Sequence, residues 1–293
     1  MSKSELAQSL SHFWSSITNS MVWDTLKNFA NSAFTTALIG SLAGAFAGAY
    51  AAQRIVERGK RREELLREIR NTNAAIAIAF GICNSLLSLK KQYVKELKIK
   101  YDTDRAAAQA FYERFIKGEV PEEELFSFKA DLQTLQLTSL PTDILQEVIF
   151  ERLSLVGRPL NLVMTLAQTA RCLDGSIEKR NTLIEKYKTE SAEKNPKFPK
   201  LYFGLPYSEG HVNLDYPSSV EAIANQTNDG IFFSNLLCKD LSEHGQRLAD
   251  EYKNMFKNEA PIVSKVDFGP AADLLPDEKD YSDWTAAFVK KAS

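Results

Sequence analysis

The stretch Gly40-Ser41-Leu42-Ala43-Gly44-Ala45-Phe46-Ala47-Gly48 lies within residues 28–53, a segment that contains no charged residue. As an α-helix this segment extends about 39 Å, which exceeds the roughly 30 Å of hydrocarbon in a bilayer. We therefore predict that residues 28–53 form a single transmembrane helix. The alternative is a cleaved signal peptide, but such a peptide has a shorter apolar run close to a basic N-terminus.

Small residues line one flank of this predicted helix, because Gly40, Gly44 and Gly48 stand four residues apart. Such a flank lets two backbones approach closely and gain van der Waals contact that lipid does not supply. We predict that it packs against other copies of the chain in a homo-oligomer such as a tetramer. Thr36 and Ser41 add hydroxyl groups, which either bond to a neighbouring helix or line a narrow pore. The alternative is the general abundance of glycine and alanine in membrane helices.

The residues on either side of the apolar segment differ in charge. Residues 54–100 carry twelve bases and five acids, a net charge of +7, whereas Lys3 and Lys27 are the two bases that precede the segment. Because basic residues stay on the cytoplasmic side of a membrane, we predict that the C-terminal part is cytoplasmic. Residues 1–27 place apolar residues and two tryptophans at helical spacing, which predicts an amphipathic helix at the membrane interface.

A second uncharged segment, residues 71–89, has 19 residues, barely enough to cross a bilayer. Its asparagine, serine and threonine residues make it more polar than residues 28–53, and Lys90 and Lys91 follow it directly. A hairpin of two spans would place these lysines on the wrong side of the membrane. We interpret residues 71–89 as a buried helix of the soluble part, with a second span as the alternative.

The rest of the chain is predicted to be helical, so the fold class is all-α. Charged residues make up 25% of the 293 residues, which excludes a transporter with many spans. No segment shows the sustained period-two alternation of a strand. We expect residues 54–258 to form a helical stalk and bundle, interrupted by a loop at residues 191–218. Residues 259–293 are interpreted as an acidic, irregular tail with a short helix near residues 284–289.

Proline, serine and glycine set the expected helix ends within the bundle. Pro121 followed by three glutamates resembles a first helical turn, so we expect a helix at residues 121–137. A longer helix is expected at residues 141–190, with a bend near Gly157. Ser218 or Ser219 is the expected cap of a further helix, which ends at about residue 258.

Sequence motifs of known enzymes and metal sites are not found. The sequence has no glycine-rich phosphate loop, no HExxH and no GxSxG, and its three histidines are far apart. We therefore predict that the protein is not an enzyme and uses no metal or cofactor. Cys83, Cys172 and Cys238 are far apart in apolar, helix-like stretches, and we predict three buried thiols.

Residues 186–207 interleave lysines with aromatic residues, a combination that suits phosphates and stacked bases. Within this region the candidate ligand-binding residues are Lys194, Lys197, Phe198, Lys200 and Tyr202. In the alternative interpretation, the aromatic rings anchor the loop to the bundle while the lysines remain in water.

The layout of one span joined to a helical cytosolic part, with the run Gly40, Gly44 and Gly48, resembles the membrane effectors of bacterial anti-phage defence systems. Within that group it is similar to the Hailong type, an all-α membrane protein that forms an oligomeric channel. The resemblance implies an inner-membrane location and control by an oligonucleotide from a partner nucleotidyltransferase. The loop from Lys194 to Tyr207 and the basic stalk would then contact this ligand. No signature motif accompanies the layout.

These observations lead to two main functional hypotheses, and a third, a membrane-anchored enzyme, would require a convergent polar pocket. The first is an oligomeric membrane effector, a ligand-gated pore or ion channel that disrupts the inner membrane in anti-phage defence. The second is a membrane-tethered helical scaffold or sensor, which dimerises through its span without forming a pore. The number of copies distinguishes them, since four or more copies around an axis favour a pore.

Overall fold

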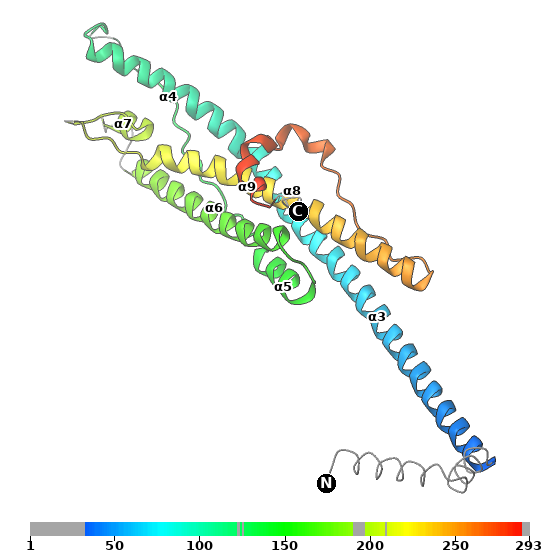
Figure 1. The fold of residues 1–293 in the computed structure, drawn as a ribbon. Helices are drawn as coiled ribbons and strands as arrows, with labels where there is room; N and C mark the ends of the chain where they lie inside the picture. Colours follow the sequence, from blue (N-terminus) through cyan, green and yellow to red (C-terminus); the bar gives the residue numbers. More distant parts are fainter. Residues whose placement is uncertain (1–32, 122–123, 125, 190–196, 209, 289–293) are drawn as a thin grey trace, which may run out of the picture. The chain divides into compact units, whose positions relative to one another are not determined.

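The computed structural model describes residues 33–121, 124, 126–189, 197–208 and 210–288, with side chains from residue 37 onward (Figure 1). Every named element in these ranges is a helix, and the one β-bridge joins Ser208 to His211. The all-α prediction is therefore confirmed for the described residues. The predicted interfacial helix at residues 1–27 lies outside them. The chain divides into two compact units, Met1–Glu63 and Glu64–Ser293.

Three consecutive helical elements cover the first described residues. Helix α3, Ala33–Leu89, has 57 residues, and the π-helical turn η1, Lys90–Val94, connects it to α4, Lys95–Ile116. The sequence contains no proline between residues 33 and 120, so no missing N–H interrupts the helical hydrogen bonds. Helix α4 ends where Gly118 adopts a left-handed conformation with φ of 73°, a common stop for helices.

The predicted helix at residues 121–137 is wrong, because the described residues from 126 to 141 have no helix. We call residues 129–138 the strap. Side chains of other elements bond its backbone: Asn181 donates to the carbonyl of Leu135 at 2.7 Å and accepts from its N–H at 3.0 Å. Asp174 accepts from the N–H of Thr138 at 2.8 Å. These bonds replace the helical ones, because a buried backbone polar group needs a partner of either kind.

The helix expected at residues 141–190 is two helices, α5, Thr142–Arg152, and α6, Arg158–Thr189. Gly157 between them has a φ of 75°, which breaks the helix where a bend was expected. The N–H of Ser154 in this break donates to Glu68 of α3 at 2.9 Å. Arg158 then fixes the start of α6, since its Nε donates to Asp240 of α8 at 2.9 Å.

The loop expected at residues 191–218 contains a short helix, α7, Phe198–Phe203, and is shorter than predicted. Helix α8, Asp215–Phe256, begins before the expected serine caps. The N–H of Asp215 donates to the side chain of Asn213 at 2.9 Å, and Pro217 is tolerated because it lies in the first turn. At Gly204 a Cβ atom would lie 2.9 Å from Leu214 and from Pro217, and its φ is 69°, so this turn requires glycine.

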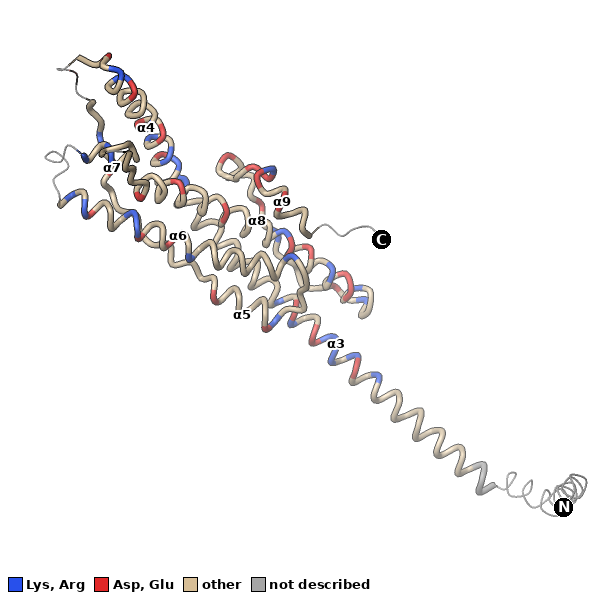
Figure 2. Tube along the Cα trace, turned by 60° about the vertical axis from the view of Figure 1, so that its left-hand side comes forward, with Lys and Arg blue, Asp and Glu red and all other residues tan. Residues whose placement is uncertain are grey.

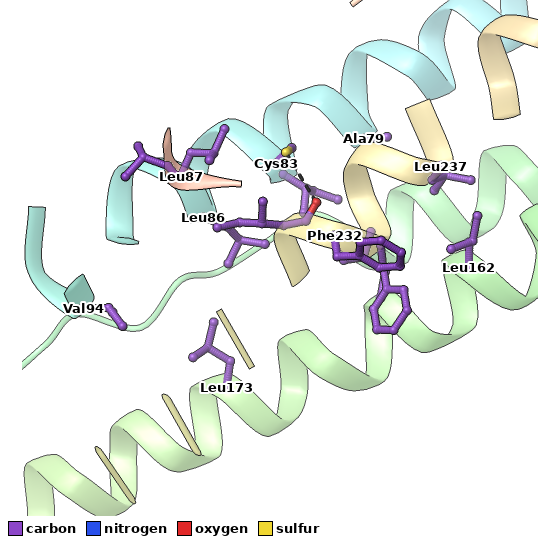
Figure 3. Close-up of a cluster of buried hydrophobic side chains, with 14 of the residues drawn as sticks. Ala79, Cys83, Leu86, Leu87, Val94, Leu162, Leu173, Phe232 and Leu237 are labelled. Atoms are coloured by element: carbon purple, nitrogen blue, oxygen red, sulfur yellow. Dashed lines mark hydrogen bonds between the residues drawn. The ribbon is translucent and has the colours of Figure 1, made fainter. Parts of the chain in front are cut away.

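The hydrophobic core of the second unit lies between α3, α6 and α8 (Figure 3). Helices α6 and α8 pack along each other, and Leu162 and Leu237 are both fully buried between them. From α3 the core receives Ala79 and Cys83, which are also fully buried. Residues 71–89 thus behave as the buried helix that their polarity indicated.

The C-terminal tail folds onto the bundle. It contains two 3₁₀ helices, η2, Gly269–Leu274, and η3, Glu278–Tyr281, followed by α9, Ser282–Ala286. The ring of Tyr281 stacks on Phe232 of α8 with centroids 3.8 Å apart, and its hydroxyl donates to Asp229 at 2.9 Å. The short helix therefore exists, two residues earlier than predicted, and the tail is more ordered than its composition indicated.

Candidate functional site

Residues 37–53 of α3 contain the glycine run, and we call them the bare segment. Residues 37–53 are all exposed, including Phe46, which is 75% exposed, and Ile39, which is 61% exposed. A Cβ atom built on Gly40, Gly44 or Gly48 would meet nothing within 4 Å. Packing within the described chain therefore does not explain why these three positions are glycine.

A helix that is apolar on all sides is ordinarily covered by protein or by lipid. Monomeric soluble proteins rarely expose contiguous apolar patches of more than a few hundred Å². In this segment the large apolar residues lie on one side of the helix, within about a third of its circumference, and no described residue covers them. They are Leu38, Ile39, Leu42, Phe46 and Tyr50. This segment therefore needs a lipid or protein environment.

The two polar residues that we assigned to the packing flank differ in what the structure describes. The hydroxyl of Ser41 donates to the carbonyl of Leu38, one turn earlier in the same helix, at 2.9 Å. Its hydrogen-bonding need is thus met without a neighbour, which makes the residue tolerable in a bilayer. Thr36 belongs to α3, but its side chain lies outside the described part of the structure.

One helical run in the described chain, Ala37–Ile116, is long and apolar enough to cross a membrane by length and composition. A core helix of a soluble protein meets the same criterion, and 44% of the most apolar window is buried inside the protein. Eight of residues 72–89 are buried, so that part of the run is a core helix. Residues 37–53 of the same run are exposed.

Basic residues follow the bare segment along α3 (Figure 2). The guanidinium of Arg54 donates to the hydroxyl of Tyr50 at 3.0 Å and lies 5.0 Å from the centre of its ring. Gln53 donates to Glu57 at 2.8 Å one turn further on. Arg58, Lys60, Arg61 and Arg62 are all exposed. An aromatic ring and a set of exposed cations are typical of the boundary between membrane and cytoplasm.

The structure places the aromatic residues of the candidate ligand loop in the core. Phe198 is 6% exposed and Tyr202 is 3% exposed. Tyr202 stacks on Tyr216 with ring centroids 4.4 Å apart, and Phe198 stacks on Phe128 at 5.9 Å. Buried rings offer no open face to a base, so this arrangement fits the alternative in which the aromatic residues anchor the loop. Lys194 lies outside the described residues.

The hydroxyl groups beneath this loop are also occupied. The N–H of Asp131 in the strap donates to the hydroxyl of Tyr202 at 3.1 Å, and the hydroxyl of Tyr216 donates to the carbonyl of Asp131 at 3.2 Å. Tyr101 of α4 donates to the carbonyl of Tyr202 at 3.0 Å. Burial raises the pKa of Tyr202 far above its usual value. The tyrosine cluster thus ties α4, the strap, α7 and α8 together.

The two described lysines of the loop lie over other rings. The ammonium of Lys197 is 5.9 Å from the ring centre of Tyr207, and that of Lys200 is 5.4 Å from the ring centre of Tyr112 on α4. Both distances suit a cation–π interaction. The two cations are therefore surface groups, and they do not converge on the rings of Phe198 and Tyr202.

No protein-family model, curated protein or solved structure matches this chain. Its function is therefore inferred from the arrangement of its own residues. Among the described residues, no group of three or more histidine, cysteine, aspartate and glutamate side chains could hold a metal ion.

The cysteines correct one prediction. Cys83 and Cys238 are buried, as expected, but Cys172 of α6 is exposed. Burial raises the pKa of the Cys83 thiol to about 11 and that of Cys238 to about 12. These two thiols therefore stay protonated and unreactive at neutral pH.

One buried charge escaped the motif search. Arg180 of α6 is 1% exposed and occupies a position in the apolar stripe between Ile177 and Ile184. Its NH1 group donates to the carbonyl of Gln133 in the strap at 2.8 Å. The signal was present in the sequence, because an arginine at helical spacing within a buried stripe is unusual.

Proposed function

We propose that this protein is an oligomeric membrane effector, in which copies of the bare segment of α3 associate in the bilayer and form a gated pore. The observation that carries the proposal is that residues 37–53 are uncharged and exposed, while Gly40 and Gly44 have free space around them. Lipid covers the large apolar side chains, and the glycine flank of a second copy fills the space beside the backbone.

The helical second unit then acts as the control element on the cytoplasmic side. The exposed cations after the bare segment support this orientation, and α3 connects the two parts because it runs without interruption from Ala33 to Leu89. In this proposal residues 54–63 form a stalk below the membrane. The effector works by physical opening, and no catalytic group is assigned to it.

The biological setting follows from the resemblance to Hailong-type effectors of anti-phage defence. Opening of the pore would disrupt the bacterial inner membrane, and an oligonucleotide from a partner nucleotidyltransferase would control the opening. The surface cations Lys197 and Lys200 are the described residues of the candidate loop that such a ligand can reach. Phe198 and Tyr202 would support the loop from beneath.

The proposal is tested with purified protein in liposomes, by dye release or single-channel conductance. Gly44→Leu places bulk on the glycine flank, whereas Ala49→Leu places the same side chain on the opposite side of the helix. We expect Gly44→Leu to abolish both oligomer formation and conductance, and Ala49→Leu to keep both. Wild-type protein that is monomeric in mild detergent and leaves vesicles sealed would contradict the proposal.

The scaffold hypothesis is favoured by one further observation, since Ser41 satisfies its own hydroxyl within the helix and need not line a pore. A scaffold would be a dimer, and the molecular mass of the detergent-solubilised protein separates it from a ring of four or more copies. Ligand control is tested with Lys197→Ala and Lys200→Ala against Lys239→Ala, an exposed lysine of α8 that pairs with Glu278 at 3.0 Å.

A further inference from the structure

A cavity of about 420 Å³ lies where η1 and α4 meet the strap and α6. Its volume is in the range of roughly 300–1,000 Å³ that is typical of small-molecule sites. Tyr93 of the π-helical turn is one of its lining residues and is 42% exposed. Leu97 and Leu135 form a buried apolar wall. A π-helical turn beside a cavity is a frequent feature of functional sites.

Arg180 is one of the residues that line this cavity, and its guanidinium lacks a counter-charge. Within the described residues, no carboxylate oxygen is paired with it at 4 Å or less. A guanidinium has five N–H donors. The NH1 group of Arg180 donates to the carbonyl of Gln133 at 2.8 Å, and the guanidinium also bonds to the hydroxyl of Tyr216. The Nε atom is buried and has no hydrogen-bond partner.

The Arg180 guanidinium also contacts an aromatic ring. The Arg180 guanidinium carbon lies 5.7 Å from the ring centre of Tyr216. A cation–π contact offsets only part of the cost of burying a charge. A buried cation with unmet donors is therefore the strongest attraction for a ligand in this cavity.

Three other charged side chains line the cavity, and none is as buried as Arg180. Lys100 is exposed and donates to the carbonyl of Lys129 at 2.9 Å, so it adds a second cation at the rim. Glu96 is exposed to water, which screens its charge. A carboxylate oxygen of Asp131 accepts from the N–H of Gln133 at 2.9 Å and is occupied in that turn. Among these groups Arg180 is the buried one, and charge interactions are strongest where water is excluded.

We propose that this cavity binds a small organic anion, whose carboxylate or phosphate group bonds to Arg180 and Lys100. Its apolar body lies against Leu97, Leu135 and the ring of Tyr93. The site is separate from the lysine loop and does not depend on pore formation. Binding would also act on the strap, because the carbonyl of Gln133 that accepts from Arg180 belongs to it. Asp131 of the strap bonds to Tyr202 of α7, so α7 is the next element along this connection.

The test is calorimetric titration of the full-length protein in detergent with phenyl phosphate, benzoate and benzyl alcohol. These probes share an aromatic body, and the first two carry the two acid groups that a natural ligand could have. We expect one or both anions to bind in the millimolar range or tighter, and benzyl alcohol to bind at least about tenfold more weakly. Whichever anion binds more tightly identifies the acid group. Anions that bind no better than benzyl alcohol would overturn the proposal.

Variants locate the binding. Arg180→Met keeps the length of the side chain and removes its charge, and Lys100→Ala removes the cation at the rim. We expect affinity to fall about tenfold or more in the first and about threefold or more in the second. Lys95→Ala removes another exposed charge from the same helix outside the cavity and should bind as the wild type does. If Arg180→Met does not fold, Lys100→Ala decides: wild-type affinity in that variant would overturn the proposal. Because no vesicle is involved, the result is independent of pore activity.

Discussion

His244 of α8 is a buried titratable group whose partner lies on another helix. Its Nε2 atom is 3.1 Å from a carboxylate oxygen of Glu68 on α3. Burial lowers the pKa of His244 below its usual value, and the neighbouring Arg247 adds to this, although Glu68 acts in the opposite direction. The folded protein therefore prefers the neutral imidazole.

This preference predicts a loss of stability in mild acid. Above pH 7 the imidazole is neutral in both states and adds nothing. As pH falls through about 6.5, the unfolded chain takes up the proton more readily, so the free energy of unfolding decreases. We expect urea denaturation at about pH 7.5 and 5.5 to show a smaller decrease for His244→Gln than for wild type. The exposed His211→Gln is the control, and an equal decrease in all three proteins would refute the prediction.

Asn181 shows how one side chain can replace helical hydrogen bonds. Its amide bonds both the N–H and the carbonyl of Leu135, so Asn181→Ala leaves two strap groups without a partner. We expect a loss of about 1–3 kcal/mol in the free energy of unfolding. Thr182→Ala, one residue further on an exposed side of α6, should change it by less than about 0.5 kcal/mol. Denaturant titration of both variants measures the difference, and similar losses would contradict this role.

At the scale of the element, the glycines of α6 and α8 should respond in opposite ways to alanine. A Cβ atom at Gly245 would lie 2.6 Å from Val263 and 3.2 Å from Thr72, whereas one at Gly175 would meet nothing within 4 Å. Both contacts of Gly245 are to stiff, β-branched side chains. We expect Gly245→Ala to lose about 1–2 kcal/mol and Gly175→Ala to gain about 0.5–1 kcal/mol. Thermal unfolding measures both changes in stability. A Gly245→Ala variant that is more stable than the wild type would contradict the prediction.

The elements that could be predicted from sequence are those with a long apolar period. Helix α8 was predicted to within a few residues, because its buried stripe continues through Leu237 and Leu248. The strap could not be predicted, since its bonds come from Asn181 and Asp174, about 40 residues further along the chain. The break before α6 was underestimated for the same reason, because it depends on a contact between Ser154 and Glu68.

The candidate sites show the same contrast between features set by the local sequence and features set by distant contacts. The lack of charge in the glycine run predicts a membrane helix, and the flank of three glycines predicts contact with other copies, which stays a prediction. The burial of Phe198 and Tyr202 was left open, since aromatic residues among lysines suit a core and a ligand site equally well. The cavity at Arg180 was missed, because it joins four elements that sequence order does not bring together.

At the scale of the whole molecule, the second unit contains the buried core, from Leu65 to Leu274. We therefore expect a fragment of residues 58–293 to be soluble without detergent and to unfold cooperatively, since it keeps this core and omits the bare apolar segment. The full-length chain should require detergent. Circular dichroism and sedimentation measure both properties. A full-length protein that stays soluble and monomeric in plain buffer would contradict the membrane proposal.

The π-helical turn Lys90–Val94 determines where this part of the chain tolerates the deletion of one residue. Such a turn holds one residue more than an α-helical turn, so a one-codon deletion within it would leave every later residue of α4 facing as it does now. The same deletion at Lys98 would rotate the rest of α4 by about 100°. The turn is thus a place where the chain can lose one residue without misaligning the bundle. Because Gln92 and Tyr93 lie in it, deletion of either residue would reshape the wall of the Arg180 cavity.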